Sequence, residues 1–147
     1  MVGVNVQERR SVDQSMSSCD AQKETGVFKN IRSILIVDED GDVLNQLSQS
    51  FTICAKQYNI CLAKNGSDAL KVLKNSSVTI LLAALNLPII KGFDLVDYTK
   101  IYYPATRIFV MSEEDPSTIK KRLDDLSISG YIRKPFRIEM IYSVLRL

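Results

Sequence analysis

Short apolar runs alternate along the chain with segments whose apolar residues recur at helical spacing. The first run, Ser33–Val37, is apolar after its serine and rich in β-branched residues, as in a strand that is covered on both faces. Four later segments also have strand character. Together they predict five strands, at residues 33–37, 59–63, 78–83, 107–111 and 129–132.

Five helices are predicted between and after these strands. The apolar residues of the first helix fall on one stripe, at Leu44, Leu47, Phe51, Cys54 and Tyr58. The turn Asn65-Gly66-Ser67 precedes the second helix, and Asp115 followed by Pro116 is typical of the start of the fourth. The remaining patterns place helices at residues 68–73, at 92–102, around Ile119, Leu123 and Leu126, and around Ile138, Ile141, Tyr142 and Leu145.

Strands that alternate with helices in this way predict an α/β fold, in which helices cover both faces of a parallel sheet. The ligand sites of such folds lie outside the carboxyl ends of the strands. Four residues fall just after the first, third, fourth and fifth predicted strands, namely Asp38, Ala84, Ser112 and Lys134. We therefore expect Asp38, Ala84, Ser112 and Lys134 to meet at one edge of the sheet.

Ala84 is the unexpected member of this set. A carboxylate, a hydroxyl and an ammonium group together are typical of a pocket that accepts a phosphoryl group. An alanine methyl neither attacks phosphorus nor binds a metal, whereas a carboxylate does both. No aspartate or glutamate occurs from Val78 to Lys91, so a shift of register does not supply the missing acid.

Composition narrows the classes of function. The chain of 147 residues is 46% hydrophobic and 24% charged, which fits one globular domain, here residues 30–147, after a disordered polar tail over residues 1–29. It contains no histidine, which excludes Ser-His-Asp and Cys-His catalysis. A net charge of +2 without a basic stripe gives no reason to expect nucleic-acid binding.

The cysteines and the hydropathy of the chain indicate in which cellular compartment the protein is found. Cys19, Cys54 and Cys61 show no Cys-x-x-Cys spacing, so we expect free thiols in a reducing cytosol and a cytoplasmic protein. No apolar stretch reaches the roughly 20 residues that span a bilayer. We therefore expect no membrane partner.

From about residue 31 to residue 147 the chain resembles the receiver domain of bacterial response regulators, the CheY-like family. Five segments carry the resemblance, in the order 34–40, 65–70, 86–88, Ser112 and 130–136. It implies a flavodoxin-like, three-layer fold with a five-stranded parallel sheet of order 2-1-3-4-5 and five helices. It also implies two-component or phosphorelay signalling, in which an aspartate takes a phosphoryl group from a histidine of a partner kinase.

The resemblance assigns a metal site to the first and third loops. Asp38 and Glu39 match the acidic pair that holds Mg²⁺, and Asn86 should offer its backbone carbonyl to the same ion. Clustered oxygen ligands suit such a hard divalent cation.

The resemblance also assigns the residues that respond to phosphorylation. Ser112 matches the hydroxyl that bonds the phosphoryl oxygen and moves on activation. Lys134 matches the cation that neutralises the phosphoryl group, and Tyr131 matches the aromatic residue whose rotation reports the switch. The bond between Lys134 and Pro135 is expected to be cis, as is frequent in the family.

The chain departs from the family at Ala84, which occupies the acceptor position by register with Asn86-Leu87-Pro88. Lys91 adds positive charge where the family often carries an acid or an amide. Because a first ligand is lost, we expect weak Mg²⁺ binding at most. We also expect no stable phosphorylation and no enzymatic activity, so that no residue is assigned as catalytic.

We expect the domain to act through protein binding instead. The expected partners are a sensor histidine kinase or another signalling protein, and a second copy of the chain. The expected surface comprises the last two helices and the fifth strand, with Arg137 and Tyr142 as exposed contributors.

Two other interpretations stay open. One is a Mg²⁺-dependent receiver that an engineered Asp→Ala change at position 84 has inactivated. The other is a small-molecule binder of flavodoxin type, although a flavin phosphate needs donors where this chain has acids. Plainer roles also remain: acids at a helix N-terminus for Asp38-Glu39-Asp40, a turn for Ser112, solvation for Lys134 and strand packing for Tyr131.

Overall fold

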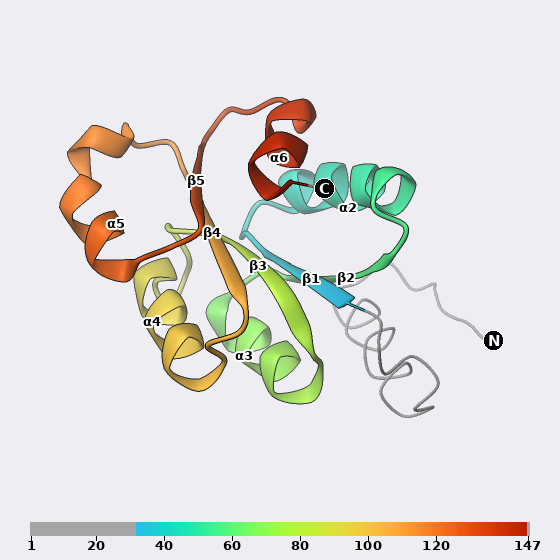
Figure 1. Cartoon of the computed structure of the whole chain (residues 1–147), viewed down its shortest axis with the longest axis horizontal. Coiled ribbons are helices and arrows are strands. Elements are labelled where there is room, and N and C mark those ends of the chain that lie inside the picture. Colours follow the sequence, from blue (N-terminus) through green and yellow to red (C-terminus); the bar gives the residue numbers. More distant parts are fainter. Residues whose placement is uncertain (1–31, 147) are drawn as a thin grey trace.

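The computed structural model describes residues 32–146, which form a five-stranded parallel sheet of order β2-β1-β3-β4-β5 between two layers of helices (Figure 1). This confirms the predicted fold class and strand order. The elements are β1 (Arg32–Val37), α2 (Gly41–Cys54), β2 (Tyr58–Ala63), α3 (Gly66–Asn75), β3 (Val78–Ala84), α4 (Gly92–Tyr102), β4 (Arg107–Ser112), the 3-10 helix η2 (Pro116–Thr118), α5 (Lys120–Leu126), β5 (Gly130–Arg133) and α6 (Ile138–Leu145).

The central strands are buried on both faces, as their apolar sequences require. Every residue of β1 after Arg32 is buried, and so are the last five residues of β3. The edge strand β2 instead alternates toward its end between buried and half-buried positions. A central parallel strand is covered by helices on both sides, whereas an edge strand is partly open to solvent.

Two helices, α2 and α6, lie side by side on one face of the sheet, and α3 and α4 lie on the other (Figure 1). Tyr142 of α6 joins the first pair, because its ring packs 5.7 Å from that of Phe51 and its hydroxyl donates to the carbonyl of Ser50 at 2.8 Å. Tyr142 is therefore half-buried, and the expectation that it is an exposed contact residue is wrong. Arg137, at the start of α6, is exposed as expected.

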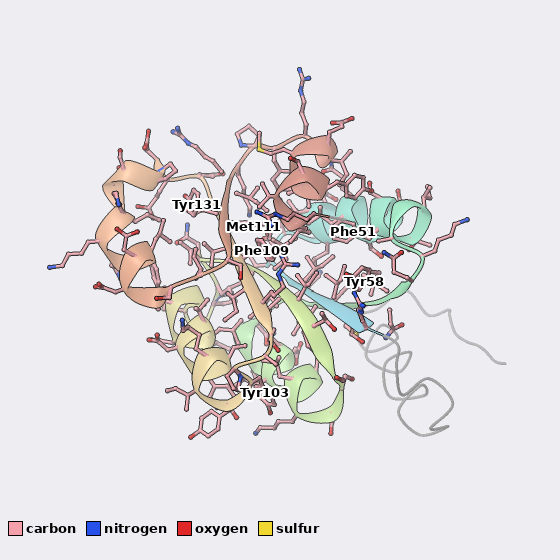
Figure 2. All side chains as sticks on the ribbon, viewed as in Figure 1. Phe51, Tyr58, Tyr103, Phe109, Met111 and Tyr131 are labelled. Carbon is pink, nitrogen blue, oxygen red and sulfur yellow. The ribbon has the colours of Figure 1, made fainter. Side chains whose placement is uncertain are left out.

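The core is centred on β4, where Phe109 and Met111 lie in the middle of the molecule (Figure 2). Both side chains are fully buried. Gly130 of β5 makes room for the ring of Phe109, since a Cβ at that position would lie 2.8 Å from it. A closely packed interior therefore supports the carboxyl ends of the strands.

Some element boundaries differ from the predicted ones. Tyr58 begins β2 and does not extend the helical stripe, because α2 ends at Cys54. Pro116 begins a 3-10 turn, capped by Asp115, and α5 starts only at Lys120. Tyr58 lies 14 residues after Leu44, a spacing that fits a helical stripe. The match is a coincidence, because the chain turns between α2 and β2.

Cys61 forms a disulfide bond, so the expectation that all three cysteines are free thiols is wrong. Its side chain is buried on β2. Disulfide formation depends on the distance between two cysteines in space, which sequence spacing does not report. The tail expected over residues 1–29 lies outside the described residues.

Within residues 32–146, no helix combines the length and the apolar composition needed to cross a lipid bilayer.

Candidate functional site

The carboxyl ends of four strands bring Asp38, Ala84, Ser112 and Lys134 to one edge of the sheet. In the strand register Val37 pairs with Ala83, and Ala84 pairs with Met111, the residue before Ser112. Ser112 in turn accepts a backbone hydrogen bond from the amide of Lys134 at 2.8 Å. The order of strands, β1, β3, β4 and β5, thus sets the order of these four residues along the edge.

Asp38 is the buried acid of this edge, with a relative exposure of 2%. Its Oδ1 atom accepts from the backbone amide of Asp40 at 3.0 Å. Its Oδ2 atom accepts from the Nζ atom of Lys134 at 2.5 Å. Both carboxylate oxygens are therefore engaged, one by backbone and one by a charge-assisted hydrogen bond.

Lys134 reaches Asp38 from the far side of the pocket. It directly follows β5, and β3 and β4 separate β5 from β1 in the sheet. The side chain of Lys134 is 19% exposed and that of Asp38 is 3% exposed, so this ion pair is largely shielded from solvent. The bond between Lys134 and Pro135 is cis, which confirms the expectation.

Ala84 ends β3 between the neighbours just described, with a relative exposure of 3%. The start of α4 packs directly behind it. A Cβ placed on Gly92 would lie 2.4 Å from the carbonyl oxygen of Ala84 and 2.5 Å from the Cα of Leu85. Glycine at position 92 is therefore required for this close approach, which fixes the backbone at position 84.

Ser112 and Tyr131 both bind the backbone of Glu114. The Oγ atom of Ser112 accepts from the amide of Glu114 at 3.1 Å. The hydroxyl of Tyr131 donates to the carbonyl of the same residue at 2.5 Å. The two side chains that the resemblance assigned to switching thus hold the loop between β4 and α5 from two directions.

Arg133 is a further contact to this loop that the sequence analysis missed. Its Nε atom donates to the carbonyl of Glu113 at 3.4 Å, and its Nη1 atom lies 3.3 Å from Oδ2 of Asp115. Hydrogen bonds from the side chain and backbone of Ser117, together with the charge of Arg133, lower the pKa of Asp115. Arginine directly before Lys134 was visible in the sequence, but nothing there located its acceptors.

The residues present fit Mg²⁺ poorly. Glu39 and Asn86 lie on the same edge but are exposed, and Asp38 is already paired with Lys134. Position 84 contributes a methyl group. Among residues 32–146, no three histidine, cysteine, aspartate or glutamate side chains gather in a way that could hold a metal ion. A hard divalent cation prefers clustered oxygen ligands, and the one buried carboxylate of this edge already has partners for both of its oxygens.

A separate groove of about 560 Å³ lies between α5 and β5. Apolar parts of Pro116, Leu123, Ile128 and Tyr131 line it, together with the ion pair of Lys120 and Asp124. Tyr131 lies on the side of β5 that faces α5 (Figure 2). The groove shares no lining residue with the pair of Asp38 and Lys134, but Tyr131 links it to the loop that Ser112 holds.

Comparison with known proteins gives a consistent result. Residues 34–146 match the family described as the response regulator receiver domain. A cyclic di-GMP phosphodiesterase of Thermotoga maritima is 26% identical over 109 residues, which are 74% of this chain and 28% of that protein. The autoinducer 1 sensor kinase/phosphatase LuxN of Vibrio harveyi is 29% identical over 113 residues, 77% of this chain and 13% of that protein.

Solved structures share the fold. The signal receiver domain of an HD domain-containing protein from Pseudomonas fluorescens Pf-5 has a TM-score of 0.71 at 26% identity, covering 78% of this chain and 91% of that one. The chemotaxis response regulator CheY4 of Vibrio cholerae has a TM-score of 0.70 at 23% identity, covering 79% and 97%. The chain spans less than a third of the two curated relatives named above.

Proposed function

The chain belongs to the response regulator receiver domain family, and we propose that it is a receiver that signals by protein binding without accepting a phosphoryl group at position 84. Receiver domains are non-catalytic signalling modules of two-component systems, and they interact with sensor kinases or other signalling proteins.

The observation that carries the proposal is the methyl group of Ala84 at the end of β3. The family reaction needs a carboxylate oxygen that attacks phosphorus and leaves an acyl phosphate. The side chain of Ala84 has no lone pair to donate, and Asp38, the buried acid beside it, has both oxygens engaged. The other acids of the loop after β1, Glu39 and Asp40, are exposed.

We place the partner surface on α5, β5 and α6. The groove between α5 and β5 offers apolar contact area, flanked by the charges of Lys120 and Asp124. Met140 of α6 is 48% exposed and Arg137 is exposed near it in the chain. An apolar centre with a charged rim is typical of protein interfaces. A sensor kinase, another signalling protein or a second copy of this chain would use the same surface.

A second candidate function is a phosphorylation-competent receiver that an Asp→Ala change at position 84 has inactivated. It is favoured by the presence of an acid, a hydroxyl and a lysine at the strand ends, namely Asp38, Ser112 and Lys134. The codon for position 84 in the source gene distinguishes the two. An aspartate codon there favours the inactivated receiver.

The experiment that tests the proposal is incubation with MgCl₂ and acetyl phosphate, read by intact mass. We expect no added phosphoryl group on the protein, and a phosphoryl group on the Ala84→Asp variant under the same conditions. A stable phosphoryl group on the unaltered chain, mapped by peptide analysis to a residue of the strand-end pocket, would contradict it.

The partner surface is tested by sedimentation velocity or by binding to a cognate kinase. The association of Met140→Asp is compared with that of the control Ile53→Asp, which changes an exposed apolar residue of α2.

A further inference from the structure

The ion pair between Lys134 and Asp38 joins two residues that the family resemblance assigns to different tasks. Asp38 was expected to hold a metal ion, and Lys134 to neutralise a phosphoryl group. In the structure the ammonium group lies on the carboxylate at 2.5 Å. The positive charge nearest the buried acid of this edge is therefore a side chain of the protein itself.

The charges of the pocket explain this arrangement. With alanine at position 84, the buried part of the edge contains one carboxylate, Asp38, and one ammonium group, Lys134. Their charges cancel. A second carboxylate at position 84 would leave an excess negative charge between β1 and β4, which a divalent cation would relieve. The ratio of carboxylates to ammonium groups thus decides whether this edge needs a metal ion.

Moving the ammonium group of Lys134 away from Asp38 would destabilise the folded protein. The Lys134 side chain is mostly buried, and a buried charge that loses its partner is strongly destabilising. The backbone amide of Asp40 also holds the other oxygen of Asp38, which fixes the carboxylate toward Lys134. A metal ion would have to compete with both contacts for the same two oxygens.

We propose that Lys134 is a built-in counterion that takes the place of the divalent cation and keeps the pocket of this receiver in one metal-independent arrangement. The inference rests on the proposed function, because it requires that no acceptor carboxylate occupies position 84. It goes further in assigning to Lys134 the exclusion of divalent cations from Asp38.

The test is calorimetric titration with MgCl₂, supported by the Mg²⁺-dependent change in melting temperature. We expect no saturable binding at the pocket of the unaltered chain or of Lys134→Arg, which keeps the charge. Lys134→Met should raise the affinity for Mg²⁺ by about tenfold or more. The matched control is Lys64→Met, because Lys64 is an exposed lysine after β2 on the same edge and its removal changes the net charge equally.

Each outcome decides the inference. It is overturned if the unaltered chain binds Mg²⁺ as tightly as Lys134→Met, or if Lys134→Met gains no more affinity than Lys64→Met. Should Lys134→Met fail to fold, Lys134→Gln removes the charge and keeps a donor for Asp38, and the same comparison applies. The readout needs neither a partner nor a phosphodonor, so a failure here leaves the proposed function standing, whereas phosphorylation of the unaltered chain removes both.

Discussion

The Nζ atom of Lys134 lies 2.5 Å from Oδ2 of Asp38 and connects the loop after β1 to the loop after β5. Ninety-six residues of sequence separate the two. Because β3 and β4 lie between these strands in the sheet, the pair ties together both sides of the strand-end pocket. We therefore expect the ion pair to contribute to the stability of the domain.

We expect Lys134→Met to lower the free energy of unfolding by about 3 kcal/mol, because it leaves Asp38 buried without its counterion. Lys134→Met combined with Asp38→Asn should recover a large part of this loss, since neither charge then remains. Urea unfolding of the two single variants and the double variant in a chelator gives the coupling energy. Additive effects of the two substitutions would show that the ion pair does not couple the loops.

Ala84→Asp should lower the melting temperature in a chelator, with a loss on the order of 1 kcal/mol, because it adds a second buried carboxylate beside Asp38. Mg²⁺ should restore part of the loss. Ala84→Asn is the matched control, since it has almost the same shape without the charge, and Mg²⁺ should leave its melting temperature unchanged. An Ala84→Asp protein that is more stable than the original without metal would contradict the argument.

Ile89, in the loop between β3 and α4, has a φ angle of 68° and is 86% exposed. A β-branched residue is strained in this left-handed region, which asparagine tolerates far better. Ile89→Asn should therefore stabilise the domain by about 0.5–1 kcal/mol in urea unfolding. Ile101→Asn is the control, because Ile101 is 70% exposed within α4 and has no positive φ angle. Equal effects of both substitutions would show that the gain comes from replacing an exposed apolar side chain with a polar one, and not from relief of backbone strain.

The pKa of Asp115 is lowered from its ordinary value of 3.8, chiefly by the side-chain hydrogen bond from Ser117. A lowered pKa in the folded state stabilises the protein above the pKa of the unfolded state. This contribution is lost as the pH falls from about 3.8 through the lower folded value. Ser117→Ala should raise the pKa of Asp115 toward its ordinary value, as measured by NMR titration of the Asp115 carboxyl carbon. Thr118→Ala, one residue further along η2, is the control, and an Asp115 pKa that Ser117→Ala leaves unchanged would contradict the argument.

The fold was predictable from the sequence because the period of the apolar residues changes from strand to helix at every element. β1 is apolar from Ile34 onward and β3 from Ile80 onward, as in central strands that are covered on both faces. Tyr58 was misplaced because a helical stripe and the first residue of the next strand happened to share a spacing. Periodicity reports which residues are buried, and it does not report where the chain turns.

The site was less predictable than the fold. The strand ends located Asp38, Ala84, Ser112 and Lys134, since each follows a recognisable strand. The pairing of Lys134 with Asp38 could not be predicted, because a lysine side chain is long and flexible and its partner depends on which charges are buried nearby. The disulfide of Cys61 was missed because sequence spacing does not report which cysteines lie close in space. The contacts of Arg133 were missed because its side chain, like that of Lys134, is long and flexible.

The contact of Gly92 with the backbone of Ala84 and Leu85 has a consequence for how this domain can change. The start of α4 approaches position 84 through main-chain atoms, so this close approach does not depend on which side chain stands at position 84. Chemistry and architecture are thus separable at this point: an acidic group could be gained or discarded here by one substitution while the sheet and its loops keep their course. A receiver built in this way can exchange a phosphorylation-dependent mode of signalling for a constitutive one without having to evolve a new fold.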